Sequence, residues 1–398
     1  MKRYFLYIAG IFALLITSCG TKQESMDALI KDRLDRSIEQ YNLMAQSLID
    51  QPDRLPRTID AEGKLLTTTS NGWVSGFVPG TLWYLYQYGN DPKMLDYARN
   101  YTARIEQEKH NRSTHDLGFM LYCSFGNGYR LAGDTAYRNI MLTGAESLST
   151  RFNPIIGSIR SWDFNRDKWQ FPVIVDNMMN LEFLFWASKT SGDPKYRNIS
   201  LSHADRTMKE FFRPDNSSYH VVSYDPETGE VEKKNTFQGY ADESAWARGQ
   251  AWGLYGFVVM YRETQDQKYL EQAKKIADFL LHHPHLPADR IPYWDFNAPD
   301  IPDALRDASA GAVMASALIE LSGFVDADLA KEYLSVAETQ IRTLSSPEYF
   351  AEKGTNGNFI IKHSVGNLPG NAEIDVPISY ADYYYIEALI RFMNLKKN

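Results

Sequence analysis

The sequence is poor in cysteine: among its 398 residues only Cys19 and Cys123 occur. We expect Cys19 to belong to a processed N-terminal segment, so Cys123 would be left as a single thiol and no internal disulfide could form. Cys123 lies in the apolar run MLYCSF, which predicts a buried and unreactive side chain. The fold must therefore depend on its hydrophobic core, for which a 44% share of hydrophobic residues is ample.

The motifs that define several large enzyme classes are also missing. The sequence has no Gly-rich phosphate loop, no dinucleotide fingerprint and no Gly-x-Ser-x-Gly elbow. The histidines of LHHPH, residues 281–285, follow an amphipathic stretch, and we expect them to face solvent rather than to bind a metal ion. We therefore expect neither a metal site nor a cofactor.

Positive charge is scarce as well. The 42 Lys and Arg residues are outnumbered by 50 Asp and Glu residues, which gives a formal net charge of −8. An acidic surface argues against nucleic acid as a partner. It still permits an anionic substrate, provided that a few cationic groups lie inside the binding pocket.

The apolar run at the N-terminus, residues 4–16, is too short to span a bilayer. It follows Lys2 and Arg3, which is the order of a secretion signal. The next residues, LITSCG, resemble a bacterial lipobox, in which the cysteine is lipidated and becomes the new N-terminus. We predict a lipoprotein signal peptide at 1–19, lipidation of Cys19 and a polar tether at 20–26, with an ordinary secretion signal as the alternative. A lipid anchor would then be the membrane contact, and the protein would lie in the bacterial cell envelope, in the periplasm or at the outer membrane.

A helical hairpin recurs along the rest of the chain. In each copy an almost wholly apolar stretch ends near an acidic turn, and a stretch with one polar face follows it. The first helix of each hairpin should therefore be buried and the second should lie outside it. The aspartates of the turns are Asp91, Asp134, Asp193, Asp266 and Asp326.

With further helices expected at residues 26–49 and 380–395, the chain would form about twelve helices. Neighbouring hairpins must stack, because one hairpin cannot bury its apolar face alone. An inner and an outer ring predict an all-α fold, an (α/α)6 barrel (six-hairpin toroid), as a single catalytic domain over residues 27–398. An open helical solenoid is the alternative. The extra length between hairpins should form loops at one end, where functional residues collect.

The segments that lead into the inner helices carry acids, amides, Arg or Trp directly before an apolar run. Any one aspartate there could simply cap its helix, but in a barrel all of these segments would converge on one axial pocket. They are residues 71–80, 114–119, 171–180, 238–253, 292–312 and 373–385.

Asp176 and Asp116 are the candidate acid/base pair. Asp176 stands between VIV and NMMN, and such apolar surroundings raise the pKa of a carboxyl group. A second carboxylate across the pocket, that of Asp116, would raise this pKa further. Paired carboxylates commonly perform acid/base chemistry on sugars. Alternatively, Asp176 caps a helix and Asp116 pairs with an arginine.

The segment SAWARGQAW supplies a cationic candidate. On a helix Arg248 and Trp252 share a face, whereas Trp246 and Arg248 do not. Arg248 beside Trp252 would suit the carboxylate of a sugar acid, and the alternative is that Arg248 forms a structural ion pair. His220 and Gln238 are weaker candidates on loops. The abundance of aromatics, 13% of the chain, suits a cleft in which rings stack on sugars.

The motifs HDLGF, VDNMMN, GYADESAWARGQAWGLYG and YADYYYIEALIRF occur in this order and resemble glycoside hydrolase family 88, the unsaturated glucuronyl hydrolases. The resemblance runs from about Asp27 to the C-terminus and implies an (α/α)6 barrel. It also implies an enzyme that acts on oligosaccharides left by polysaccharide lyases. Such an enzyme hydrates the C4=C5 vinyl ether of the terminal unsaturated uronate, and the resulting hemiketal opens and releases the neighbouring sugar.

Residue by residue, the resemblance implies that Asp176 is the acid/base residue and Asp116 the second required aspartate. One departure is Val78 after Phe77, where the family often has a second Trp nearby. We expect glycosaminoglycan fragments as the substrate. The alternatives are an unsaturated rhamnogalacturonyl hydrolase acting on pectin fragments and a non-catalytic glycan-binding lipoprotein. The side chains that the resemblance places around the uronate are Trp73, His115, Trp162, His220, Gln238, Arg248 and Trp252.

Overall fold

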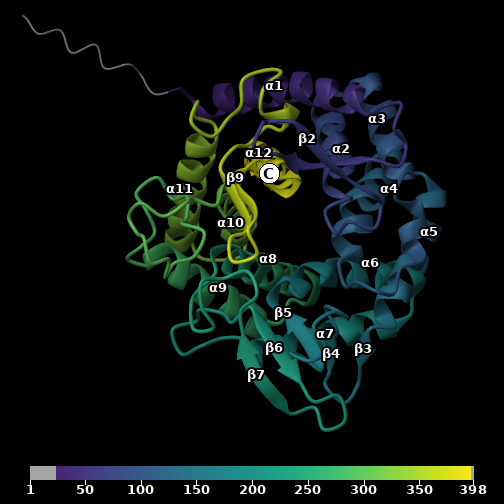
Figure 1. Cartoon of the computed structure of the whole chain (residues 1–398), viewed down its shortest axis with the longest axis vertical. Coiled ribbons are helices and arrows are strands. Elements are labelled where there is room, and N and C mark those ends of the chain that lie inside the picture. Colours follow the sequence, from purple (N-terminus) through teal and green to yellow (C-terminus); the bar gives the residue numbers. More distant parts are fainter. Residues whose placement is uncertain (1–23, 396–398) are drawn as a thin grey trace, which may run out of the picture.

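The computed structural model describes residues 24–395, which form two concentric rings of helices (Figure 1). The inner helices are buried over most of their surface, whereas the outer helices bury one face. The inner helices are α2 (Phe77–Gly89), α4 (Asn127–Ala132), α6 (Leu181–Ser191), α8 (Ala247–Thr264), α10 (Ala308–Ser322) and α12 (Ser379–Asn394). The outer helices are α1 (Met26–Ser47), α3 (Pro92–Ala103), α5 (Thr135–Ser149), α7 (Pro194–Glu210), α9 (Gln267–His282) and α11 (Ala327–Leu344).

The inner ring closes on itself. Helix α8 contacts α6 and α10, α10 contacts α12, and α12 contacts α2. The π-helix η2 (Gly118–Gly126), which runs directly into α4, contacts both α2 and α6 and completes the ring. This confirms the predicted (α/α)6 barrel and excludes the open solenoid, because a solenoid has no contact between its first and last inner helices.

The predicted signal peptide at 1–19, with the lipidation site Cys19, and residues 20–23 of the predicted tether lie outside the described residues. The division of the chain into signal, tether and catalytic domain stays a prediction. Helix α1 begins at Met26, at the predicted end of the tether. The helix begins there because the Ser25 hydroxyl accepts a hydrogen bond from the Ala28 N–H and caps it.

The acidic turns predicted from the sequence are helix caps. Each of the aspartates begins an outer helix and accepts a backbone N–H with its side chain. The preceding inner helix commonly ends in a left-handed residue, such as Gly133 or Gly192. The turns from inner to outer helix are therefore short, and they gather at one end of the barrel. The aspartates are Asp91, Asp134, Asp193, Asp266 and Asp326.

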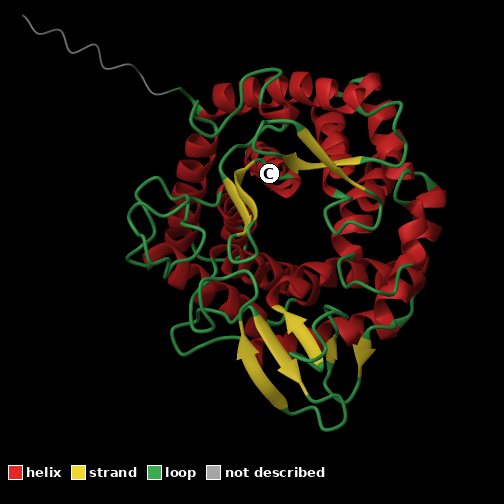
Figure 2. Ribbon diagram, in the orientation of Figure 1, coloured by secondary structure: helices red, strands yellow, loops and turns green. Residues whose placement is uncertain are grey.

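The long connections, from each outer helix to the next inner helix, gather at the other end. The prediction of loops there missed four small antiparallel sheets (Figure 2). Hydrogen bonds pair β1 with β2, β3 with β4, and β8 with β9, and β6 lies between β5 and β7. The strands are β1 (Leu55–Ile59), β2 (Leu65–Thr68), β3 (Phe152–Asn153), β4 (Ser158–Ile159), β5 (Phe171–Ile174), β6 (Val221–Tyr224), β7 (Val231–Asn235), β8 (Ser364–Asn367) and β9 (Ala372–Val376).

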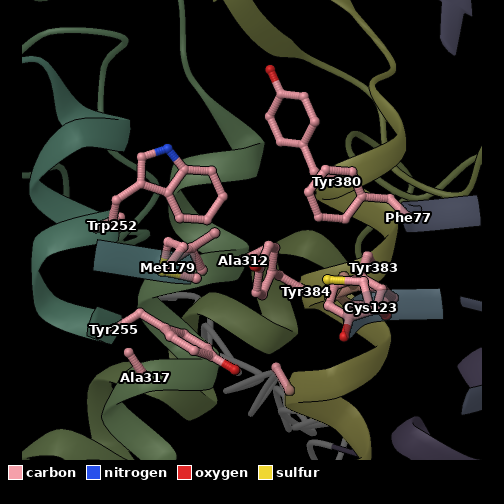
Figure 3. Packing of buried hydrophobic residues seen from close by; sticks show 14 of the residues in the cluster. Phe77, Cys123, Met179, Trp252, Tyr255, Ala312, Ala317, Tyr380, Tyr383 and Tyr384 are labelled. Atoms are coloured by element: carbon pink, nitrogen blue, oxygen red, sulfur yellow. The ribbon is translucent and has the colours of Figure 1, made fainter. Parts of the chain in front are cut away.

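Aromatic side chains fill the middle of the barrel (Figure 3). Trp252 of α8 packs against Phe119 of η2 and Tyr384 of α12, with ring centres 5.3 Å apart in both pairs. Phe77 packs against Tyr380 at 5.7 Å. These rings are buried and close the axis between the two ends of the barrel.

One smaller expectation is confirmed and another only in part. Cys123 is buried, and this burial raises the pKa of its thiol, so the side chain is held in its unreactive form. His282 and His285 are exposed, but His283 is half-buried, with its ring centre 4.7 Å from that of Phe296. Of the helices formed by residues 24–395, none has both the length and the apolar character needed to cross a membrane.

The cap of α5 offers a test of the turn chemistry. We expect Asp134→Ala to lower the free energy of unfolding by about 1 kcal/mol, because the Ala136 N–H loses its acceptor. Asp134→Asn keeps an acceptor oxygen and should cost much less. Urea denaturation followed by circular dichroism measures both, and equal losses for the two variants would contradict the capping role.

Candidate active site

A small pocket of about 80 Å³ lies at the end of the barrel where the inner helices begin. It brings together residues from segments that are far apart in the chain. Most of the side chains singled out from the sequence line it, together with Ile174; His220 and Trp252 do not. The lining residues predicted from the sequence are Trp73, His115, Asp116, Trp162, Asp176, Gln238 and Arg248.

Asp176 lies in the 3-10 helix η3 (Val175–Asn180), directly before α6, and is only 7% exposed. Burial raises the pKa of its carboxyl group to about 7; the charge of Arg248 opposes this shift and that of Asp116 adds to it. Among the described residues, no group forms a hydrogen bond with its Oδ2. The pocket therefore contains a carboxyl group that still holds its proton near neutral pH and has a free oxygen.

Asp116 is held by its neighbours in the chain. The Thr114 hydroxyl donates a hydrogen bond to Asp116 Oδ2 at 2.6 Å. His115 Nε2 lies 3.3 Å from Asp116 Oδ1, and His115 Nδ1 lies 3.0 Å from the carbonyl oxygen of Ser161. Since a carbonyl can only accept, the imidazole carries its proton on Nδ1. Burial lowers the pKa of His115, although Asp116 opposes this shift, so the ring is neutral.

The two aspartate segments are joined by a hydrogen bond. Asp116 precedes the π-helix η2, and π-helical turns are frequent at functional sites. The Gly118 N–H at the start of η2 donates to Asn180 Oδ1 at 2.8 Å, at the end of η3. This bond fixes the separation of Asp116 and Asp176 across the pocket.

His220 stands behind Asp176. Its Nδ1 accepts the backbone N–H groups of Phe237 at 3.1 Å and Gln238 at 3.2 Å, so its proton must be on Nε2. Nε2 lies 3.8 Å from Asp176 Oδ2, too far for a hydrogen bond but directed at that oxygen. Burial lowers the pKa of His220 to about 3, so the ring adds no charge beside Asp176.

Arg248 lines the pocket, but its partners differ from those expected. The guanidinium lies over the ring of Trp246, 4.5 Å from its centre, and 5.3 Å from that of Tyr380. Pairing Arg248 with Trp252 was therefore wrong. Trp246 lies before the first residue of α8 and has non-helical backbone angles, so helical spacing does not predict where its side chain points. Trp252 is fully buried, in the aromatic packing below the pocket.

Asp307 is a residue that the sequence did not single out. Its Oδ2 accepts a hydrogen bond from Arg248 Nη1 at 2.6 Å, and both side chains are buried. The ion pair left as an alternative for Arg248 thus exists within the pocket wall. Asp307 also caps α10. An aspartate directly before an apolar helix is expected as a cap, so the sequence alone did not indicate the ion pair with Arg248.

The β8–β9 hairpin is tied to the same group of residues. The guanidinium of Arg248 also donates to the carbonyls of Val365 and Gly366, and Gln238 Nε2 donates to Gly366 at 3.0 Å. Together with the bond to Asp307, the guanidinium makes three hydrogen bonds, all to groups of the protein.

A larger cavity of about 470 Å³ lies toward the other end of the barrel. Its acids already have partners: Glu387 accepts hydrogen bonds from Tyr84, Tyr255 and Ser316, and Glu182 pairs with Arg262. The free carboxyl group of Asp176 is in the small pocket, which is therefore the better candidate for catalysis despite its size. Among residues 24–395 no group of three or more His, Cys, Asp or Glu side chains is placed to hold a metal ion.

Comparison with known proteins agrees with this site. Residues 51–393 match the model of Glycosyl Hydrolase Family 88. The chain is 43% identical to an unsaturated glucuronyl hydrolase of Formosa agariphila, over 99% of both chains. It is 33% identical to an unsaturated chondroitin disaccharide hydrolase of Streptococcus agalactiae, over 85% of both chains.

The structure is similar to a crystal structure of an unsaturated glucuronyl hydrolase specific for heparin, with a TM-score of 0.91 and 47% identity. The match covers 94% of this chain and 99% of that one. With the barrel and the family model over most of its length in agreement, the chain belongs to glycosyl hydrolase family 88.

Proposed function

We propose that this enzyme releases the 4,5-unsaturated uronic acid from the non-reducing end of glycosaminoglycan oligosaccharides produced by lyases. One observation carries the proposal: the buried carboxyl group of Asp176, whose pKa is raised to about 7, so that a large share keeps the proton near neutral pH, in a pocket beside a second aspartate. Protonation of an alkene carbon needs a proton donor of this kind.

The residues of the pocket suggest the course of the reaction. Asp176 gives its proton to C4 of the vinyl ether, and the positive charge that forms at C5 is stabilised by the ring oxygen and by Asp116. Water then forms a bond to C5 and gives a proton to the Asp176 carboxylate, which restores the acid. The product is a hemiketal at C5, which opens by breaking the C5–O5 ring bond: C5 becomes a ketone and the hydroxyl proton passes to O5. This leaves a hemiacetal at C1, which becomes an aldehyde by breaking its C1–O bond to the neighbouring sugar. The sugar takes up the proton and leaves as an alcohol.

The choice of substrate class rests on the relatives. One of the similar structures is specific for heparin, and several curated relatives act on unsaturated chondroitin disaccharides by name. Arg248 adds a cationic group that suits the uronate carboxylate. Nothing in the pocket favours pectin fragments or binding without catalysis.

We predict that the purified enzyme removes the absorbance of the unsaturated bond from heparin or chondroitin disaccharides. The rate should fall as the pH rises through about 7, because Asp176 acts in its protonated form and loses the proton there. Asp176→Asn should fold and lose activity by at least 10²-fold. Wild-type activity in this variant, or loss of absorbance only with pectin-derived disaccharides, would contradict the proposal.

The ion pair of Asp307 leads to a second prediction. Asp307→Asn keeps the oxygen that caps α10 but removes the charge that orients Arg248, so kcat/KM should fall by about 10²-fold, mainly through KM. Ser309→Ala removes a hydroxyl that donates to Asp307 and leaves the ion pair, so it is a matched control. Steady-state kinetics with an unsaturated disaccharide separates the two, and an unchanged KM in Asp307→Asn would reject the positioning role.

We further propose that a lipid on Cys19 anchors the enzyme to the bacterial cell envelope, in the periplasm or at the outer membrane. Support comes from the basic residues Lys2 and Arg3, the short apolar run and the small residues before Cys19.

In a bacterial host the wild-type protein should partition into the detergent phase after Triton extraction and incorporate a labelled fatty acid. Cys19→Ala should do neither, because no thiol remains to accept the lipid. Recovery of a cleaved wild-type protein in the aqueous phase would instead indicate an ordinary secretion signal.

A further inference from the structure

We propose that Phe164 and Phe237, which extend outward from Trp162, form a shelf that binds a sugar beyond the cleaved linkage. The enzyme would then prefer oligosaccharides longer than a disaccharide. This inference rests on the proposed function and adds a specificity determinant to it.

The size of the pocket requires that the rest of the substrate lie outside it. The pocket of about 80 Å³ contains the acid and the arginine, so the terminal uronate enters it and the following sugars must cross the rim. Trp162 lines the pocket and is only partly buried. An oligosaccharide leaving the pocket beside Trp162 therefore meets whatever lies on the outer side of that ring.

Phe164 and Phe237 are the rings on that outer side. Phe164 stacks on Trp162 with ring centres 4.9 Å apart and planes inclined by 25°. Phe237 lies 5.1 Å from Trp162 and 5.7 Å from Phe164. Phe164 remains 46% exposed, whereas Trp162 and Phe237 are partly buried, and Phe237 is inclined by 49° to Phe164, so the shelf presents mainly the ring of Phe164 to solvent. A single exposed apolar side chain needs no explanation, but a contiguous aromatic patch at the edge of a pocket indicates a ligand surface.

Ion pairs and a backbone hydrogen bond fix the segments that carry the two phenylalanines of the shelf. Asp163, next to Phe164, pairs with Arg151 at 2.8 Å and lies near Arg160 and Arg166. The backbone N–H of Phe237 is bonded to His220, behind the catalytic carboxyl group. A sugar on the shelf would thus meet a preorganised surface that is connected to the pocket, which lowers the entropy cost of binding.

The test compares unsaturated disaccharide and tetrasaccharide from the same glycosaminoglycan. For the wild-type enzyme, we expect kcat/KM to be roughly tenfold higher for the tetrasaccharide, because binding energy from the remote sugars is added. Phe164→Ala should abolish this ratio through a higher KM for the tetrasaccharide. Phe164→Tyr retains a flat ring and should restore it, and Ile155→Ala, which truncates a more exposed apolar side chain outside the shelf, should leave the ratio unchanged.

Two results would overturn the shelf: no preference of the wild-type enzyme for the tetrasaccharide, or an equal loss on both substrates in Phe164→Ala. The second would mean that Phe164 merely supports Trp162. Calorimetric binding of the tetrasaccharide to Asp176→Asn, with and without Phe164→Ala, tests the shelf without turnover. Failure of the proposed function would instead appear as an inactive wild-type enzyme on every disaccharide.

Discussion

Burial of the Asp176 carboxyl group is the constraint on which the site depends. Burial makes the charged form of this carboxyl group costly and raises its pKa to about 7. The neighbours of Asp176 preserve this state: His220 is neutral, and the charge of Arg248 is largely satisfied by Asp307. The charge of Arg248 lowers the pKa of Asp176, but burial has the larger effect and keeps it raised.

In the barrel, the capped turns that stabilise the helices and the pocket with the candidate catalytic residues lie at opposite ends. Its short turns, which end at the aspartates that cap the outer helices, lie at one end, and its long connections lie at the other. The aromatic packing around Trp252 closes the axis between them. The pocket therefore has a rigid floor, while its walls come from connections that can vary without disturbing the helices.

The β8–β9 hairpin holds two of the side chains that line the pocket, those of Arg248 and Gln238. Its carbonyls at Val365 and Gly366 accept hydrogen bonds from Arg248, and Gly366 also accepts one from Gln238. A shift of the hairpin would move both pocket side chains together.

The sequence by itself determined the helical hairpins, the inner and outer faces, the capping aspartates and the pairing of Asp116 with Asp176 in one pocket. These are local properties: periodicity, turn chemistry and the apolar residues on either side of an acid. The family motifs added the identity of the side chains around the pocket.

Only the tertiary structure decided the partners of Arg248, the depth of Trp252, the protonated nitrogens of His115 and His220, and the small sheets. Arg248 contacts Asp307 and Val365, which lie 59 and 117 residues away along the chain. No local pattern encodes such contacts, because they form only when the ring of helices closes and brings its connections to one end.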